Sequence, residues 1–443
     1  MNLTETTECF ILIEPGLGYL IPVLRERFKE SKILVLHAEN FKEDAHFQNV
    51  YTLTSADAEE IYNFLETHVQ NINACRIKVI EWRPSLNYFK DAYVKIFSSA
   101  ASFLKRADAE KRTTAAFGKR WIKNFFKNIG GINNTLLYRQ AEIPVIVTGS
   151  GPSLEQALPV IQNAQNNCLI IAASSSVLAL SQAGITADIV TATDGGSWAL
   201  KHIYPFYRDQ KYADTSAFAV NLCAALPSQC ADSVQLILND GSFWQNIVLH
   251  ELSLPSVIIP QRGTVTATAV ELALTLSSGN IYLAGLDFSV NGIRSHARPY
   301  SFDNLFYSRA SRFAPFYSES YARSRLIHEG GSMGIYAAWF KEQLNKWSKR
   351  IFSIGGNKIF EHGEPSARGG LKKTENFFKT VKVENSNLFC KKGMQALLNA
   401  LKKPEYAQNI RKELNSLLFS GENEVTEGEL ETAIKEICIK ALA

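Results

Sequence analysis

A stretch of small and polar residues follows a buried apolar run about a third of the way along the sequence. The run Val145–Val147 leads into Gly149–Ser153, and a helical pattern begins at Leu154. Glycine admits a ligand close to the main chain, and the unpaired amides at the start of a helix attract anions. Ser153 stands where a helix-capping serine is expected, so a strand-to-helix turn without a ligand is equally compatible. The candidates for a phosphate cradle are Gly149, Ser150, Gly151 and Ser153.

Two aspartates and a histidine follow later apolar runs. Asp194 with Gly195 could bind a ribose hydroxyl or a divalent ion, or the carboxylate could simply cap a helix. Asp287 ends the last long apolar run, and His296 lies nine residues further along in a polar loop. A neutral imidazole there suits general acid–base chemistry near neutral pH, although a loop histidine can also be merely solvated.

Alternating apolar runs and helical patterns between residues 141 and about 290 would position these side chains. Short continuous apolar runs separated by helices are typical of a buried parallel sheet. In an open parallel sheet, ligands bind outside the carboxyl ends of the strands. The expected carboxyl ends carry Gly149–Ser153, Ser174, Ser175, Asp194 and Asp287. The spacing therefore predicts one site at that edge of an α/β fold.

The rest of the chain divides by pattern into further expected segments. Residues 1–90 read as a smaller α/β domain with strands expected over 9–14, 32–37 and 76–82, in which Gly16–Gly18 is taken as a structural turn. Residues 91–140 read as a basic helical connector whose apolar stripe includes Phe117 and Trp121. The central domain is expected over 141–362, with 291–330 as a loop-rich, substrate-covering insertion, a linker over 363–387 and a helical cap over 388–443.

Composition excludes several classes of protein. Of 443 residues, 46% are hydrophobic and 20% charged, which is ordinary for a globular protein. A net charge of +4 does not indicate general nucleic-acid binding. The seven cysteines form no Cys-x-x-Cys pair, and no apolar stretch reaches the roughly 18 residues of a membrane span. An acidic N-terminus without a signal-peptide pattern completes the expectation of a soluble, cytoplasmic protein.

Common catalytic motifs are also missing. The sequence has no Gly-x-x-x-x-Gly-Lys-Ser/Thr phosphate loop and no His-Glu-x-x-His metal pair.

Three ordered motifs resemble the motility-associated factor (Maf) flagellin glycosyltransferases, whose core is also named after a hydroxymethylpterin pyrophosphokinase. They are Val-Thr-Gly-Ser-Gly-Pro-Ser-Leu (147–154), Ile-Thr-Ala-Asp-Ile-Val-Thr-Ala-Thr-Asp (185–194) and Ala-Gly-Leu-Asp-Phe-Ser-Val-Asn-Gly-Ile-Arg-Ser-His-Ala (284–297). Residues 149–154 and 285–288 are similar as well to motifs of metal-independent bacterial sialyltransferases. The implied fold is a Rossmann-like, sialyltransferase-like central parallel sheet with a smaller N-terminal α/β domain and a C-terminal helical cap.

The resemblance implies a CMP-activated sugar as co-substrate and no cofactor or Mg²⁺. The turn 149–153 would hold the phosphate and ribose, while Arg262 or Arg294 would stabilise the leaving phosphate. His296 would be the base, with Asp287 orienting it or replacing it. The remaining implied donor-pocket residues are Ser174, Ser175, Asp194, Gly195, Thr264 and Thr266.

The expected function is transfer of a nonulosonic acid of the pseudaminic or legionaminic type to Ser/Thr of flagellin in the cytoplasm, in support of flagellar assembly and motility. Two alternatives stay open at this point. One is an ATP-dependent pterin pyrophosphokinase using Mg²⁺ held by Asp194 and Asp287. The other is a non-catalytic flagellin-binding assembly factor.

Overall fold

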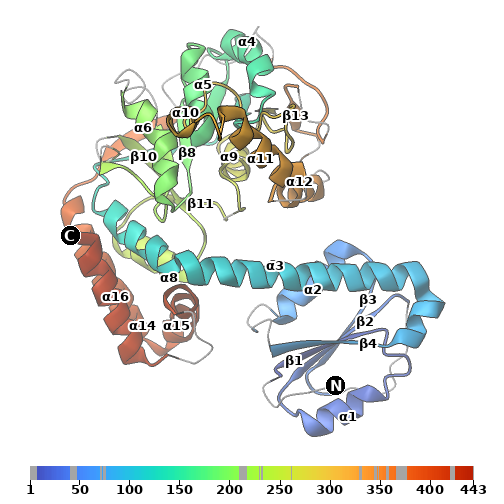
Figure 1. Cartoon of the computed structure of the whole chain (residues 1–443). Helices are drawn as coiled ribbons and strands as arrows, with labels where there is room; N and C mark the ends of the chain where they lie inside the picture. The colour runs from blue at the N-terminus through green and yellow to red at the C-terminus, as the bar shows by residue number, and fades with distance from the viewer. Residues whose placement is uncertain are drawn as a thin grey trace. The chain divides into compact units, whose positions relative to one another are not determined.

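The computed structural model divides the chain into two units, Met1–Ala116 and Phe117–Ala443, each treated by itself below (Figure 1). The described residues are 7–39, 47–69, 72, 76–208, 217–228, 230, 233–260, 262–328, 332–343, 347, 349–355, 359–365, 377–419 and 425–442.

The N-terminal unit is built on a four-stranded parallel sheet in the order β3-β2-β1-β4. Its strands are β1 (Cys9–Ile13), β2 (Lys32–His37), β3 (Val50–Thr54) and β4 (Ile77–Glu81). The helices α1 (Leu20–Arg27) and α2 (Ala58–Val69) join them. Alternate residues of β1 belong to two different apolar clusters, so the strand is covered on both faces. Strand β3 has no counterpart among the elements expected from the sequence.

One long helix, α3 (Arg83–Ile129), contains the boundary between the units. Its regular geometry is interrupted at Lys90, where φ is 27°. In its last turns Ile122, Phe125 and Ile129 are fully buried in the core of the C-terminal unit. The expected connector 91–140 is therefore this helix followed by a further strand, β5 (Asn134–Tyr138).

The C-terminal unit contains a ten-stranded sheet in the order β13-β12-β6-β7-β8-β9-β10-β5-β14, with β11 also paired to β10. All pairings are parallel except that of β14 with β5. The further strands are β6 (Val145–Thr148), β7 (Leu169–Ala173), β8 (Ile189–Ala192), β9 (Ala217–Asn221), β10 (Val234–Asn239), β11 (Ser256–Ile258), β12 (Ile281–Ala284), β13 (Ile351–Ser353) and β14 (Phe378–Lys382). Strand β14 lies inside the segment 363–387 that was expected to be a linker.

Helices cover both faces of this sheet. One face packs against the end of α3 together with α4 (Leu154–Ala164), α5 (Val177–Gln182), α6 (Leu200–Arg208) and α8 (Phe243–Glu251). The other face packs against α9 (Val265–Leu276) and α12 (Ser332–Glu342). Strand β6 serves both layers, because Ile146 joins the first cluster while Val145 and Val147 join the second.

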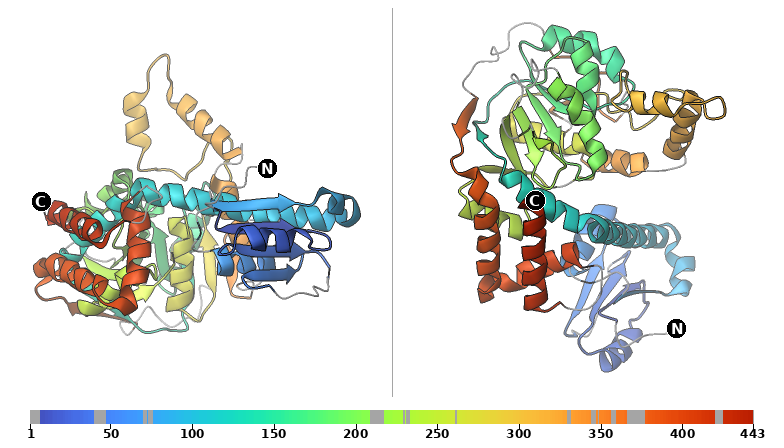
Figure 2. Two further views of the ribbon diagram at one scale, coloured as in Figure 1. Left: turned by 90° about the horizontal axis from the view of Figure 1, so that it is seen from below. Right: turned by 60° about the vertical axis from the view of Figure 1, so that its left-hand side comes forward.

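Two helical groups complete the unit. The C-terminal helices α14 (Phe389–Leu401), α15 (Pro404–Leu418) and α16 (Glu427–Leu442) lie side by side next to α8 (Figure 1). Helices α10 (Asp303–Arg309) and α11 (Phe316–His328) stand out from the body of the unit (Figure 2). The insertion 291–330 is thus partly helical and not an irregular loop throughout. Within the part of the chain that is described, no helix has the length and apolarity needed to cross a bilayer.

The mixed α/β class with a parallel central sheet, expected from the alternation of apolar runs and helices, is confirmed. The carboxyl edge of this sheet carries the candidate residues.

Candidate functional site

The topological switch point of the large sheet lies between β6 and β12. The chain proceeds from β6 through β7 to β10 on one side, and returns to place β12 on the other side of β6. The loops after β6 and β12 interlock, since the Gly149 N–H donates to Ala284 O and the Gly151 N–H to Gly285 O, both at 2.8 Å. A Cβ on Gly149 would lie 2.6 Å from the carbonyl oxygen of Gly285. The backbone approach of these two loops therefore already requires glycine here.

Asp287 supplies a negative charge at the start of α4, in addition to Glu155 in the first turn of the helix. Its Oδ2 accepts a hydrogen bond from the Ser153 N–H at 3.0 Å. The expectation that Ser153 caps this helix through its own side chain is wrong, because the cap comes from Asp287 on the neighbouring loop. The buried Ser153 Oγ has no hydrogen-bond partner among the described residues.

Ser150 joins the turn to two other loops. Ser175 Oγ donates to Ser150 Oγ at 3.0 Å, and the Ala297 N–H donates to Ser150 O at 2.8 Å. The second bond fastens the loop after β12 across the turn after β6. The structure thus brings Ser150, Ser175 and the His296 loop together, while the neighbouring Ser174 is buried at the end of β7.

His296 is held by an aromatic ring and a hydroxyl group. Its imidazole stacks on Tyr300, with ring centroids 4.0 Å apart and an interplanar angle of 16°. Nδ1 lies 2.8 Å from Ser295 Oγ. When Nδ1 carries the proton and donates it to Ser295, the lone pair is on Nε2, the state that a general base requires.

His202, on α6, was missed by the sequence reasoning. Its ring lies 5.6 Å from that of Tyr300, and its Nδ1 lies 2.5 Å from Ser301 Oγ. Burial lowers the pKa of His202 to about 4, and the nearby Asp194 carboxylate opposes this shift only in part. His202 is therefore neutral at neutral pH. The sequence offered one indication of its place: His202 lies on the α-helix that follows the loop containing Asp194.

Asp194 and Gly195 are fixed by the end of α3. Asp194 is exposed, and its Oδ1 accepts the Gly196 N–H at 2.7 Å. A Cβ on Gly195 would lie 2.5 Å from Cδ1 of Trp121, and Asn124 Nδ2 donates to the Gly195 carbonyl at 3.2 Å. The apolar stripe of α3 thus positions the loop after β8.

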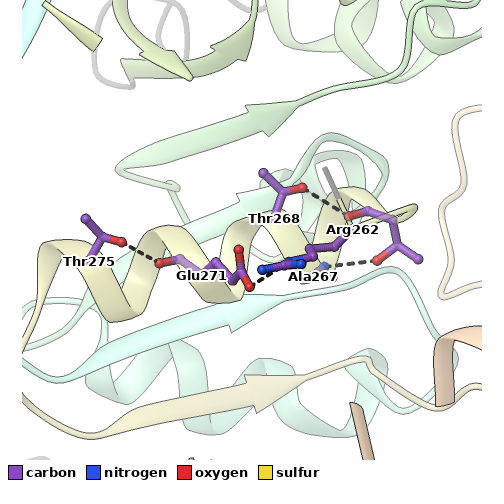
Figure 3. A network of polar contacts seen from close by, with 6 residues as sticks. Arg262, Ala267, Thr268, Glu271 and Thr275 are labelled. Atoms are coloured by element: carbon purple, nitrogen blue, oxygen red, sulfur yellow. Dashed lines mark hydrogen bonds and ion pairs between the residues drawn. The ribbon is translucent and has the colours of Figure 1, made fainter. Parts of the chain in front are cut away.

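The start of α9 is organised by its own contacts (Figure 3). Thr264 Oγ1 accepts the Ala267 N–H at 3.0 Å and caps the helix, while Thr266 lies in its first turn. Arg262 Nε lies 2.8 Å from Glu271 Oε1, and its guanidinium stands over the ring of Trp339. Burial raises the pKa of Glu271, and Arg262 opposes that shift.

Both arginines considered for the leaving phosphate have carboxylate partners. Arg262 pairs with Glu271, and the more exposed Arg294 lies 3.3 Å from Glu155. A phosphate ligand would have to compete with these partners. Their role in phosphate binding stays a prediction, as do those of the turn residues.

The two candidate acidic ligands for a metal lie on distant strands. Asp194 follows β8 and Asp287 follows β12, and the order β12-β6-β7-β8 separates these strands by three inter-strand steps. At about 4.8 Å a step, the strands are about 14 Å apart. The described residues contain no group of three or more His, Cys, Asp or Glu side chains suited to a metal ion.

Comparison with known proteins agrees with this architecture. Residues 119–292 match the family model described as 6-hydroxymethylpterin diphosphokinase MptE-like. The matched segment is thus similar to that family; it spans the end of α3 and strands β5–β12, and so includes most of the candidate residues.

A solved structure shares the fold of nearly the whole chain. It is the MAf glycosyltransferase from Magnetospirillum magneticum AMB-1, with 13% identity and a TM-score of 0.56 over 98% of this chain and 74% of that one. An uncharacterized protein of Treponema pallidum (strain Nichols) is 27% identical over 311 residues, 70% of this chain and 66% of the relative. The resemblance indicated by the motifs, a Maf-type fold around an MptE-like core, is confirmed.

Proposed function

We propose that the chain is a glycosyltransferase that moves a nonulosonic acid from a CMP-activated donor to Ser/Thr hydroxyl groups of flagellin in the cytoplasm. The observation that carries the proposal is the convergence at one carboxyl edge of the Ser150–Ser175 pair, exposed Asp194 and two histidines. The fold shared with a MAf glycosyltransferase supports the same class of reaction.

The proposed reaction is a single displacement with inversion at the anomeric carbon. The acceptor oxygen forms the new glycosidic bond as the bond from that carbon to the phosphate oxygen breaks, and CMP departs with the electron pair. His296 Nε2 takes the hydroxyl proton, while Ser295 and the Tyr300 ring hold the imidazole in place. The main-chain amides of the 149–153 turn and a hydroxyl of the Ser150–Ser175 pair stabilise the phosphate charge. Transfer is expected to proceed in the presence of EDTA.

The MptE-like match favours a second candidate, pyrophosphoryl transfer from ATP to a hydroxymethylpterin. That reaction needs Mg²⁺ close to the phosphates. Asp194 and Asp287 follow strands that are about 14 Å apart in the sheet, a spacing that does not favour a shared ion. Asp287 is also engaged with the Ser153 N–H. We therefore prefer glycosyl transfer to pyrophosphoryl transfer as the function of this chain.

Two measurements test the proposal. Mass spectrometry of flagellin should show a nonulosonic acid on Ser/Thr in cells that carry the gene and none in a deletion strain, with modification restored by complementation. Calorimetry on the purified protein should show tighter binding of CMP than of ATP, since the turn lacks the lysine of a kinase phosphate loop. Unmodified flagellin in both strains, or a clear preference for ATP with Mg²⁺, contradicts the proposal.

A further inference from the structure

A cavity of about 730 Å³ lies in the C-terminal unit. The 293–299 loop and helices α10 and α11 contribute to its lining. Its lining includes Leu158 of α4, Ala183 after α5, Tyr307 of α10 and Tyr317 of α11. The volume is in the range of binding sites. None of these residues belongs to the donor site proposed above.

The loop that carries His296 forms part of this cavity. Arg294 and Arg298 line it, and they stand two residues before and two residues after His296. Between them, the Ala297 N–H bonds to Ser150 O in the phosphate turn. One loop thus connects the cavity with the residues proposed to bind donor and to accept the proton.

The charges in the cavity are already balanced by the protein itself. Arg294 lies 3.3 Å from Glu155, and Arg298 forms an ion pair with Asp303 while its guanidinium stands over Phe316. With each cation neutralised by a carboxylate, an anionic sugar nucleotide gains little here. An uncharged ligand fits the lining better.

The aromatic lining is more exposed than that of an ordinary small-molecule site. Tyr307 is 60% and Tyr317 64% exposed, and Ile293 is 42% exposed. Tyr307 stacks on Phe316 with ring centroids 4.2 Å apart. Small-molecule pockets bury most of their ligand, whereas tyrosine and arginine around an apolar centre are typical of binding sites for polypeptides.

We infer that this cavity binds the acceptor polypeptide, through an uncharged segment with apolar side chains that flanks the modified Ser/Thr. The inference rests on the proposed function and adds to it a docking site for the acceptor, separate from the site for the donor. The bound segment lies against the 293–299 loop, and so next to His296.

The test compares two tyrosines of the same helix. Tyr317→Ala removes a cavity-lining ring, while Tyr321→Ala removes a ring of similar exposure, 57%, that does not line the cavity. A second cavity variant, Ala183→Trp, introduces a bulky ring at another residue that lines the cavity. The probes are purified unmodified flagellin and CMP, each titrated against every folded variant, followed by transfer assays.

Tyr317→Ala and Ala183→Trp should each weaken flagellin binding at least tenfold and raise KM for flagellin. CMP affinity should stay within twofold of wild type, and Tyr321→Ala should match wild type in both titrations. Wild-type flagellin affinity in both cavity variants, or a parallel loss of CMP affinity, overturns the inference while leaving the proposed function intact. A wild-type protein that neither binds nor modifies flagellin overturns the proposed function and the inference with it.

Discussion

The two parallel sheets of this chain have the same switch point and use it differently. In the N-terminal unit β1 lies between β2 and β4, and in the C-terminal unit β6 lies between β7 and β12. In both units the strand in the middle, β1 or β6, ends in a turn that contains two glycines. These are at positions 16 and 18 after β1 and at positions 149 and 151 after β6. By topology alone, each unit could hold a ligand at its carboxyl edge.

The N-terminal edge is closed by its own side chains. Glu14 and His37 are each 2% exposed, and Glu14 Oε2 lies 3.1 Å from His37 Nδ1. The other oxygen of Glu14 accepts the Ala38 N–H. An acid and a histidine that satisfy each other inside the protein are structural.

At the C-terminal edge, acid and histidine are spread over several loops and remain partly accessible. His296 and His202 each pair with a serine, and Asp194 is exposed. Topology therefore indicates where a site can form. The hydrogen-bond partners of the acidic and histidine side chains then decide whether these groups are available for a reaction.

His296→Ala should slow sugar transfer by roughly 10²–10⁴-fold, because the acceptor hydroxyl loses its base. CMP affinity should change little, since the phosphate turn is untouched. The measurement is flagellin modification with a purified CMP-sugar, with His250→Ala as control because His250 is an exposed histidine at the end of α8. Transfer at near wild-type rate would remove His296 from the mechanism.

Glu14→Ala should lower the free energy of unfolding of the N-terminal unit by about 1–3 kcal/mol, since His37 loses its carboxylate partner and the Ala38 N–H its acceptor. Sugar transfer by the folded protein should stay within twofold of wild type. Urea unfolding, with the exposed Glu60→Ala as control, measures the first effect. A large loss of transfer in the folded Glu14 variant would show that both edges take part in the reaction, against the comparison drawn above.

Much of this architecture could be predicted from the sequence, because buried parallel strands are continuous apolar runs. Three such runs in the sequence, Lys32–His37, Ile189–Ala192 and Ala217–Asn221, form strands β2, β8 and β9. Strands β3 and β5 were missed, since Val50–Thr54 and Asn134–Tyr138 mix polar and apolar residues at the margins of their sheets. Strand β14 was hidden for the same reason.

The site was harder to predict than the fold, because its contacts cross between loops. Sequence order suggested that Ser153 caps its own helix, whereas Asp287, more than a hundred residues away, does so. His202 carried no motif, and only the packing of Tyr300 and Ser301 around it reveals its place. Local sequence patterns predict which residues lie at the carboxyl edge of the sheet. They do not predict which side chains from different loops contact one another there.

His202 should make the stability of the C-terminal unit depend on pH. Its folded pKa of about 4 lies below the ordinary value of 6.5, so the unfolded chain binds more protons between these values. The stabilisation is fully present above pH 6.5 and is lost as the pH falls toward 4, by roughly 1–3 kcal/mol after allowance for partial exposure. His202→Phe should flatten this part of the profile of unfolding free energy against pH. A wild-type slope in that variant, as expected for the control His250→Phe, would assign the dependence to other groups.

Asp287→Asn distinguishes a capping role from a catalytic role for the carboxylate in the loop after β12. The asparagine oxygen can still accept the Ser153 N–H, but one negative charge at the start of α4 is lost, at a cost of about 0.3–1 kcal/mol. The matched control is Asp57→Asn in the N-terminal unit, because Asp57 Oδ1 accepts the Glu59 and Glu60 N–H groups at the start of α2, at 2.9 and 3.0 Å. Both variants should lose similar stability in thermal unfolding, and both should transfer sugar within tenfold of wild type. If Asp287→Asn instead loses a hundredfold or more in transfer while its unfolding matches that of Asp57→Asn, the Asp287 carboxylate acts in the reaction itself. It would then replace His296 as the base or orient it.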